Sequence, residues 1–115
     1  MRLDHVALTV RDRERSAAFY AEHFGMTERI HDDEDRLILG DAAGSLLALS
    51  AGSPPPGLPR NNHFGFRLDH GDDVRAARER LRAAGVAELE WQDDGLVVRV
   101  QVEDPDGYGV ELYAF

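Results

Sequence analysis

The chain has 115 residues, enough for one domain with its own core or for two small modules that share one. Its net charge is −9, so its surface repels phosphate backbones and nucleic acid is not an expected partner. There is no cysteine, which excludes disulfides, thiolate metal sites and a thiol nucleophile. A bound metal must therefore use His, Asp or Glu.

No stretch of the sequence approaches the roughly 18–20 consecutive apolar residues that a membrane span needs. Hydrophobic residues make up 43% and charged residues 30%, a balance that favours an ordinary globular domain. A strand pattern begins at Leu3, so a signal peptide is not expected and a cytoplasmic location is predicted.

The first half of the chain opens with a predicted strand at Leu3–Val10, because its side chains alternate in character. One face carries Val6, Leu8 and Val10, and the other carries His5, Ala7 and Thr9. Asp12 is placed to cap a helix over Arg13–Phe24, in which apolar residues recur at helical spacing. Gly25 follows where a C-terminal cap belongs.

Three short strands are predicted next, separated by acidic or glycine-containing turns, at Glu28–Asp32, Arg36–Leu39 and Ser45–Leu49. Residues 53–60 are rich in proline and supply few N–H donors, so this stretch cannot pair in a sheet. We interpret it as a linker that follows a first module at residues 1–52.

The same order of elements starts again in a second module at residues 61–115. Asn62–Asp69 is predicted to be a strand, with Phe64, Phe66 and Leu68 on one face and His63, Gly65 and Arg67 on the other. Asp72 or Asp73 is expected to cap a helix over Val74–Ala84, which Gly85 ends. Three more strands are predicted, at Glu88–Gln92, Leu96–Glu103 and Val110–Phe115.

The β-α-β-β-β order thus occurs twice, about 58 residues apart, and His5 and His63 occupy equivalent positions in the first strand of each module. One such unit has a helix on one sheet face and must bury the other face against something. We therefore predict an α+β fold, in which two βαβββ repeats form a curved mixed sheet around a cavity, with the helices on the outer face. His5 and His63 are expected to point into the cavity.

The final strand contains a residue that does not fit its surroundings. The residue types of the segment Asp104–Gly107 predict a turn, and the strand predicted after it is apolar apart from Glu111. A carboxylate at the centre of an apolar strand is costly to bury unless it is paired or holds a metal. We expect His5 and His63 to be its partners.

These segments resemble the vicinal oxygen chelate superfamily, which groups glyoxalase I, bleomycin-resistance proteins, fosfomycin-resistance transferases and extradiol dioxygenases. The resemblance covers nearly the whole chain. The segments that carry it are Leu3–Asp12, Ser16–Tyr20, Phe24–Met26, Asn62–Phe66 and Glu103–Leu112. It implies a small-molecule substrate, a homodimer, and a metal site whose ligands come from the first and last strands of each module.

Carried over by this resemblance, His5 and His63 match the two first-strand metal ligands, and Glu111 matches the last-strand carboxylate and is the candidate catalytic residue. Ala48 stands where a glyoxalase-type protein has a fourth ligand, a glutamate. Two imidazoles and one carboxylate suit a divalent ion such as Fe²⁺ or Mn²⁺, and Zn²⁺, Ni²⁺ and Co²⁺ also fit. The alternative is a degenerate site in which Glu111 only hydrogen-bonds the imidazoles.

Arg99, Gln101 and Tyr113 are the candidates to bind and orient a substrate. If the valines that alternate with Arg99 and Gln101 face the helix, these two side chains enter the cavity, where Arg99 can bind a carboxylate or phosphate. The alternative is an ion pair from Arg99 to a neighbouring acid, and Tyr113 can equally serve to pack. The arginine-rich second helix is interpreted as a solvated face, and the remaining histidines as surface residues: His23, His31 and His70.

Four functions of the superfamily compete. Glyoxalase-type isomerisation needs a second carboxylate as base, which Ala48 removes, and extradiol cleavage expects a tyrosine where Gln101 stands. Fosfomycin-type transfer expects cations and hydroxyls, whereas the second module is acidic. We predict a metal-dependent enzyme, a lyase/isomerase or dioxygenase relative, that acts on a small oxygen-bearing molecule. The alternative is a metal-free binding protein of the bleomycin-resistance type.

Overall fold

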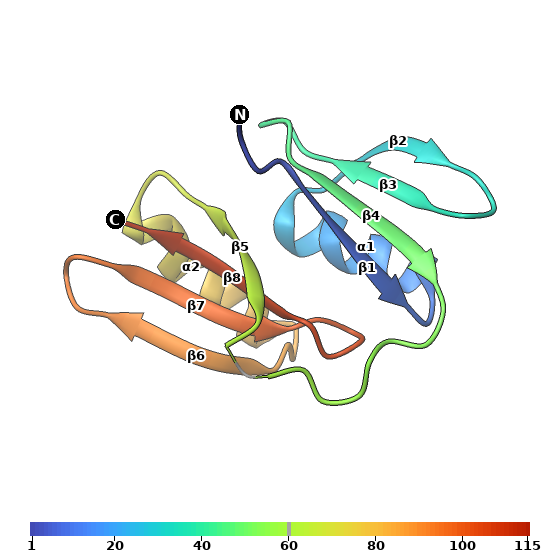
Figure 1. Ribbon diagram of the computed structural model, residues 1–115. Coiled ribbons are helices and arrows are strands. Elements are labelled where there is room, and N and C mark those ends of the chain that lie inside the picture. The colour runs from blue at the N-terminus through green and yellow to red at the C-terminus, as the bar shows by residue number, and fades with distance from the viewer. Residues whose placement is uncertain (60) are drawn as a thin grey trace. The chain divides into compact units, whose positions relative to one another are not determined.

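One strand, one helix and three further strands follow one another twice in this computed structural model, which describes residues 1–59 and 61–115 (Figure 1). The chain divides into two compact units, Met1–Pro56 and Gly57–Phe115. The division falls inside the proline-rich stretch 53–60, whose last residue, Arg60, lies outside the described residues. The repeated order and the mixed sheet in each unit confirm the predicted fold class.

The sheet of the first unit has the strand order β1-β4-β3-β2. β1 (His5–Val10) runs parallel to β4 (Leu46–Ala51), which pairs antiparallel with β3 (Leu37–Gly40), and β2 (Glu28–Asp32) forms an edge. The helix α1 (Arg13–Phe24) contacts β4. The buried apolar residues of this unit come from the helix, from the connection that follows it and from alternating positions of the strands: Leu8, Val10, Ala17, Tyr20, Phe24, Met26, Leu37, Leu39, Leu47 and Leu49.

The sheet of the second unit repeats this arrangement with the order β5-β8-β7-β6. It consists of β5 (His63–Arg67), β6 (Glu88–Asp93), β7 (Val98–Glu103) and β8 (Gly109–Ala114), with β5 and β8 parallel. The helix α2 (Gly71–Ala83) packs on β7 and β8. The buried apolar residues are Val74, Ala77, Leu81, Val98, Val100, Val102, Val110, Leu112 and Ala114.

The two sheets also share an irregularity. The pairing of β2 with β3 shifts register between Arg29 and His31, and the pairing of β6 with β7 shifts between Glu88 and Glu90. A bulge of this kind bends its strand and re-aims the side chains beyond it. Its occurrence at matching points shows that the internal repeat extends to the detail of the hydrogen-bonded ladder.

The two helices begin in different ways. Asp12 caps α1 as predicted, because its side chain accepts hydrogen bonds from the N–H groups of Glu14 and Arg15, and Gly25 closes the helix at φ 70°. The prediction for α2 was wrong: the helix starts at Gly71, and its N-cap is His70, whose side chain makes no capping hydrogen bond.

Asp72 and Asp73, the predicted caps of α2, lie instead in its first turn. Their charges are favourable there, because the helix dipole places partial positive charge at that end. The sequence pattern could not separate this position from a true cap, since both favour aspartate. Neither helix is a candidate membrane span within residues 1–59 and 61–115.

Removing the Asp12 cap provides a test of this difference. We expect Asp12→Ala to lower the free energy of unfolding by about 1 kcal/mol, because two N–H groups at the start of α1 lose their acceptor. The matched control is His70→Ala at the equivalent place before α2, which removes no capping bond and should change stability by less than about 0.5 kcal/mol. Urea unfolding measures both, and equal losses would contradict the assignment.

Candidate functional site

The sheet face of the second unit that lies opposite α2 brings several predicted site residues together. Glu111 in β8 is paired with Gly65 in β5 and with Gln101 in β7. Side chains of directly paired residues project from the same side of a sheet. Glu111 and Gln101 therefore share one face, which also carries His63, two residues before Gly65. The valines of β7 alternate with Arg99 and Gln101 and are buried, which meets the condition stated for these two residues.

His63 and Glu111 are in direct contact. The Nε2 atom of His63 lies 2.8 Å from Oε2 of Glu111, whose side chain is only 12% exposed. On the other side of the ring, Nδ1 lies 3.0 Å from the carbonyl oxygen of Asn61. A carbonyl oxygen can only accept, so Nδ1 carries a hydrogen toward Asn61, and Nε2 is the ring atom that faces Glu111.

His5 repeats this pattern in the first unit. Its Nδ1 lies 3.0 Å from Oδ1 of Asp4, and its side chain is 67% exposed. This hydrogen bond is the main reason why the pKa of Asp4 lies below its ordinary value. A histidine that binds a metal usually donates its other ring N–H to a carboxylate or a backbone carbonyl, which fixes the ring. His5 and His63 both have such a partner on Nδ1.

Two glycines allow the close approach around Glu111. A Cβ on Gly65 would lie 3.1 Å from Cβ of Glu111 and 3.2 Å from its carbonyl oxygen. A Cβ on Gly109 would lie 2.7 Å from Nε2 of Gln101 and 3.2 Å from Cβ of His63. Any other residue at these places would displace the groups that form the candidate site.

Arg99 lies on the same face and is already held by neighbouring groups. Its NH1 atom lies 2.9 Å from Oε2 of Glu90 and 3.7 Å from Oε2 of Glu111, and its Nε donates to Oε1 of Gln92 at 2.9 Å. The ion pair to a neighbouring acid, one of the two alternatives considered for Arg99, is therefore present. The guanidinium also places a positive charge beside the carboxylate of Glu111.

Gln101 and Tyr113 have contrasting surroundings. Gln101 is only 2% exposed, and its Nε2 has no hydrogen-bond partner. The ring of Tyr113 packs edge to face on Phe115 at 5.7 Å, and the guanidinium of Arg67 lies 5.0 Å from the centre of the Phe115 ring. Packing, the alternative considered for Tyr113, accounts for this contact, whereas the Gln101 amide is left with an unused donor.

The first unit has no carboxylate at the corresponding place. Ala48 in β4 is paired with Ala7 in β1 and with Ile38 in β3, just as Glu111 is paired with Gly65 and Gln101. The register thus agrees with the prediction that Ala48 stands where a fourth ligand would be. Within either unit, among residues 1–59 and 61–115, no three His, Asp or Glu side chains form a metal-binding cluster. Whether His5 joins the His63–Glu111 pair stays a prediction.

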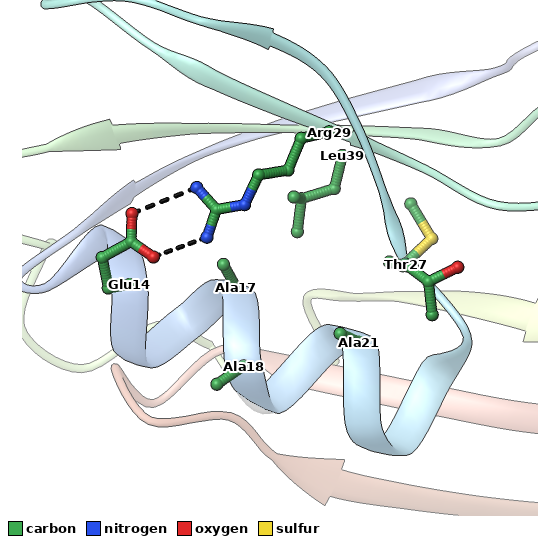
Figure 2. A pocket seen from close by; sticks show the side chains of 8 residues that line it. Glu14, Ala17, Ala18, Ala21, Thr27, Arg29 and Leu39 are labelled. Carbon is green, nitrogen blue, oxygen red and sulfur yellow. Dashed lines mark hydrogen bonds and ion pairs between the residues drawn. The ribbon is translucent and has the colours of Figure 1, made fainter.

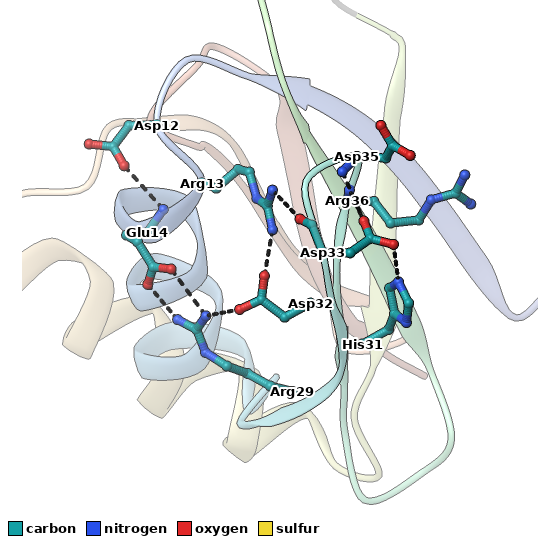
Figure 3. Close-up of polar contacts among 9 residues, drawn as sticks. All are labelled: Asp12, Arg13, Glu14, Arg29, His31, Asp32, Asp33, Asp35 and Arg36. Carbon is teal, nitrogen blue, oxygen red and sulfur yellow. Dashed lines mark hydrogen bonds and ion pairs between the residues drawn. The ribbon is translucent and has the colours of Figure 1, made fainter.

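The other histidines lie outside this arrangement. His31 is half exposed, with Nε2 2.6 Å from Oδ2 of Asp33 (Figure 3). His70 is exposed, so both are surface residues as predicted. His23 is not: its side chain is 11% exposed and packs at 5.1 Å against the ring of Phe19. The sequence signal for this was the aromatic residue one helical turn earlier.

Two arginines of α2 are bound to the sheet of their own unit. Arg75 forms ion pairs with Asp72 and Asp93, and Arg78 pairs with Glu88 while its guanidinium stacks 4.1 Å from the centre of the Trp91 ring. These contacts raise the pKa of both arginines. They tie the helix to the edge strand β6, which agrees with assigning the basic helix no role in binding.

A hollow of about 160 Å³ lies in the first unit between α1 and the adjoining strands, as Figure 2 shows. Small and apolar side chains line most of it: Ala17, Ala18, Ala21, Met26 and Leu39. An ion pair between Glu14 and Arg29 lies beside it. None of the predicted site residues lines this hollow, so it gives no support to the candidate site.

The repeated βαβββ modules, with an imidazole and a carboxylate paired on the sheet face opposite the helix, define the class of protein. A family model, the Glyoxalase/Bleomycin resistance protein/Dioxygenase superfamily, matches residues 2–112. The chain belongs to this superfamily, which confirms the resemblance to vicinal oxygen chelate proteins.

Two curated relatives come from Bacillus subtilis (strain 168). A catechol-2,3-dioxygenase is 28% identical over 97% of this chain, but the chain spans only 41% of that protein's length. A probable trivalent organoarsenical cleaving enzyme is 29% identical over 98% of this chain and 80% of its own length. Both similarities extend along nearly all of the present sequence.

Solved structures share the fold over almost the entire chain. The fosfomycin resistance protein FosX from Listeria monocytogenes has a TM-score of 0.85 at 24% identity, covering 100% of this chain and 93% of its own. The same protein complexed with Mn(II) and sulfate has a TM-score of 0.84, also at 24% identity, covering 98% and 89%. Lactoylglutathione lyase from Agrobacterium tumefaciens has a TM-score of 0.78 at 21% identity, covering 98% and 92%. At these identities the likeness shows the fold alone.

The close packing at Gly65 leads to a prediction for stability. We expect Gly65→Ala to lower the free energy of unfolding by about 1–3 kcal/mol, because the new Cβ meets Cβ and a backbone oxygen of Glu111, which cannot move independently. The matched control is Gly40→Ala, whose Cβ would meet the Ile30 side chain at 3.1 Å. Ile30 is 55% exposed and can rotate away, so we expect a change of less than about 0.5 kcal/mol by urea unfolding.

The His31–Asp33 contact leads to a prediction for pH dependence. The hydrogen bond from His31, followed by those from the N–H groups of Arg36 and Asp35, lowers the pKa of Asp33 from 3.8 to about 2. The stability that this carboxylate contributes is therefore present above pH 3.8 and is lost as the pH falls through about 2. We expect His31→Ala to raise the pKa of Asp33 in a carbon-13 NMR titration, and His70→Ala to leave it unchanged.

Proposed function

We propose that this protein is a metal-dependent enzyme of its superfamily that binds a small oxygen-bearing substrate at a divalent ion held by His5, His63 and Glu111. The observation that supports this most directly is the state of His63. Its Nδ1 donates to the carbonyl of Asn61, and its Nε2 faces the nearly buried carboxylate of Glu111. His5, whose Nδ1 is bonded to Asp4, is prepared in the same way.

The donor set suits a first-row divalent ion, with Fe²⁺, Mn²⁺, Zn²⁺, Ni²⁺ and Co²⁺ all compatible. Such an ion, when bound, acts as a Lewis acid on the substrate oxygens. The fold neighbour complexed with Mn(II) makes a metal in this architecture reasonable. Glu111 is the proposed catalytic group as well as a ligand, and NH1 of Arg99 lies 3.7 Å from its Oε2.

The reaction is proposed to be that of a lyase/isomerase or a dioxygenase relative. Ala48 at the place corresponding to Glu111 argues against a mechanism with two carboxylates, so a glyoxalase-type reaction would need another base. The chain spans 80% of the probable organoarsenical-cleaving relative, but trivalent arsenic favours soft thiolate ligands and the present sequence has no cysteine. Cleavage of an oxygenated organic substrate is more compatible with the available side chains.

Arg99, Gln101 and Tyr113 are proposed to contact the substrate, with unequal roles. Arg99 is engaged by Glu90 and Gln92, so it acts mainly through the charge that it places beside Glu111. Tyr113 supplies a ring that is packed on Phe115. We also propose a homodimer, because β2 and β6 are sheet edges in their own units and an exposed edge tends to pair or to be covered.

A metal-free binding protein of the bleomycin-resistance type is the second candidate. It is favoured by one observation: inside the unit, the carboxylate of Glu111 already has the ring of His63 and the guanidinium of Arg99 beside it. A carboxylate that already has a cationic neighbour does not require a metal ion. In that case the acidic chain, with its net charge of −9, would bind a cationic ligand.

Metal analysis of protein purified without an affinity tag separates the two candidates. We expect about one divalent ion per chain in the wild type, and loss of most of it in His5→Ala, His63→Ala and Glu111→Gln, because each removes one of three ligands. His31→Ala is the control, since that exposed histidine pairs only locally with Asp33. No ion in the wild type, together with tight binding of a cationic drug, would instead establish the sequestering protein.

A further inference from the structure

One buried polar atom in the described part of the chain has no hydrogen-bond partner: Nε2 of Gln101. The residue is only 2% exposed. Buried donors in folded proteins are nearly always paired, because leaving one unpaired forfeits its hydrogen bonds to water. A lone unpaired amide in a well-packed strand therefore requires a specific explanation.

The position of this amide connects it with the candidate site. Gln101 is the direct cross-strand partner of Glu111. Its Nε2 lies beside Gly109, where an added Cβ would be 2.7 Å from it and 3.2 Å from Cβ of His63. The unused donor thus lies next to the two residues that form the imidazole–carboxylate pair, in the space that the missing side chain of Gly109 provides.

Two acceptor atoms on this face are already in use. Oε2 of Glu111 contacts both His63 and Arg99, and Oε1 of Gln92 accepts from Nε of Arg99. These contacts link Glu111, His63, Arg99 and Gln92. The Gln101 amide donates to none of these groups, although Gln101 is paired directly across the strands with Glu111.

The fold itself does not require an amide at this place. Ile38 occupies the equivalent position in the first unit, because it is paired with Ala48 as Gln101 is paired with Glu111. An apolar side chain therefore fits at the corresponding position of the corresponding strand pair. What differs between the two units is the presence of Glu111 and of the groups that surround it.

We infer that Gln101 is a specificity-determining residue, whose Nε2–H donates a hydrogen bond to an oxygen acceptor of the bound substrate next to Glu111. This inference rests on the proposed function and narrows its substrate class. The substrate carries a carbonyl, carboxylate or oxyanion oxygen at this point, and an analogue that lacks the acceptor leaves the donor unpaired. Such an analogue should bind about 10- to 100-fold more weakly.

The test compares Gln101→Met with wild type, using Mn²⁺ alone and then oxalate, an anion whose neighbouring oxygens are all acceptors. We expect Gln101→Met to bind Mn²⁺ with unchanged stoichiometry and to bind oxalate about 10- to 100-fold more weakly by calorimetry. Without ligand it should unfold at the same or a higher temperature, because the substitution removes an unpaired donor. Gln101→Ile, which copies Ile38, is a second variant with the same expectation.

Gln92→Met is the matched control. The amide of Gln92 is fully engaged, since Oε1 accepts from Arg99 and Nε2 donates to Asp94 at 2.7 Å. We therefore expect this variant to unfold at a lower temperature than the wild type. If both Gln101 variants also unfold at a lower temperature, their amide serves the fold and the inference is overturned.

The remaining outcomes are equally decisive. A wild type that binds Mn²⁺ but not oxalate, or a Gln101→Met variant that binds oxalate as tightly as the wild type, overturns the inference. A wild type that binds no Mn²⁺ refutes the proposed function instead. The unfolding temperatures of the ligand-free variants then decide by themselves whether the Gln101 amide is kept for a ligand or for the fold.

Discussion

The contact between His63 and Glu111 is the interaction on which the candidate site depends. A carboxylate with so little exposure must be compensated, and it receives a histidine on one side and an arginine on the other. Gly65 permits the close approach of β5, since a side chain there would collide with Glu111. The carbonyl of Asn61 accepts a hydrogen bond from Nδ1 on the other side of the imidazole. This bond fixes the orientation of the ring and leaves Nε2 facing Glu111.

The two modules repeat the fold without repeating the chemistry. Their strand orders, their parallel pairings and even the bulge on the edge strand correspond. On the face opposite the helix, however, Ala48 and Ile38 in the first unit stand where Glu111 and Gln101 stand in the second. The hydrogen bonds between the strands do not depend on which of these side chains is present, because they join backbone groups alone. One module can therefore keep a plain sheet face while the other concentrates the polar groups.

Membership of the superfamily is established by the match over residues 2–112, whereas the reaction depends on individual side chains. The curated relatives are a dioxygenase and a probable organoarsenical-cleaving enzyme, and a fosfomycin resistance protein shares the fold, so the fold alone does not select a reaction. The selective features of this chain are local. They are the absence of a second carboxylate at Ala48, the charge of Arg99 beside Glu111, and a buried amide donor at Gln101.

The sequence by itself determined the order of the elements, the apolar face of the first strand in each module and the Asp12 cap. It also predicted that a histidine contacts Glu111. These follow from alternation, helical spacing and turn residues, which are properties of neighbouring positions. Only the tertiary structure decided that His70 rather than an aspartate precedes α2, that His23 packs on Phe19, that Arg99 is held by Glu90 and that the Gln101 amide is unpaired. The physical reason is that a hydrogen bond or an ion pair depends on distances between side chains from different strands, which no periodicity along one strand contains.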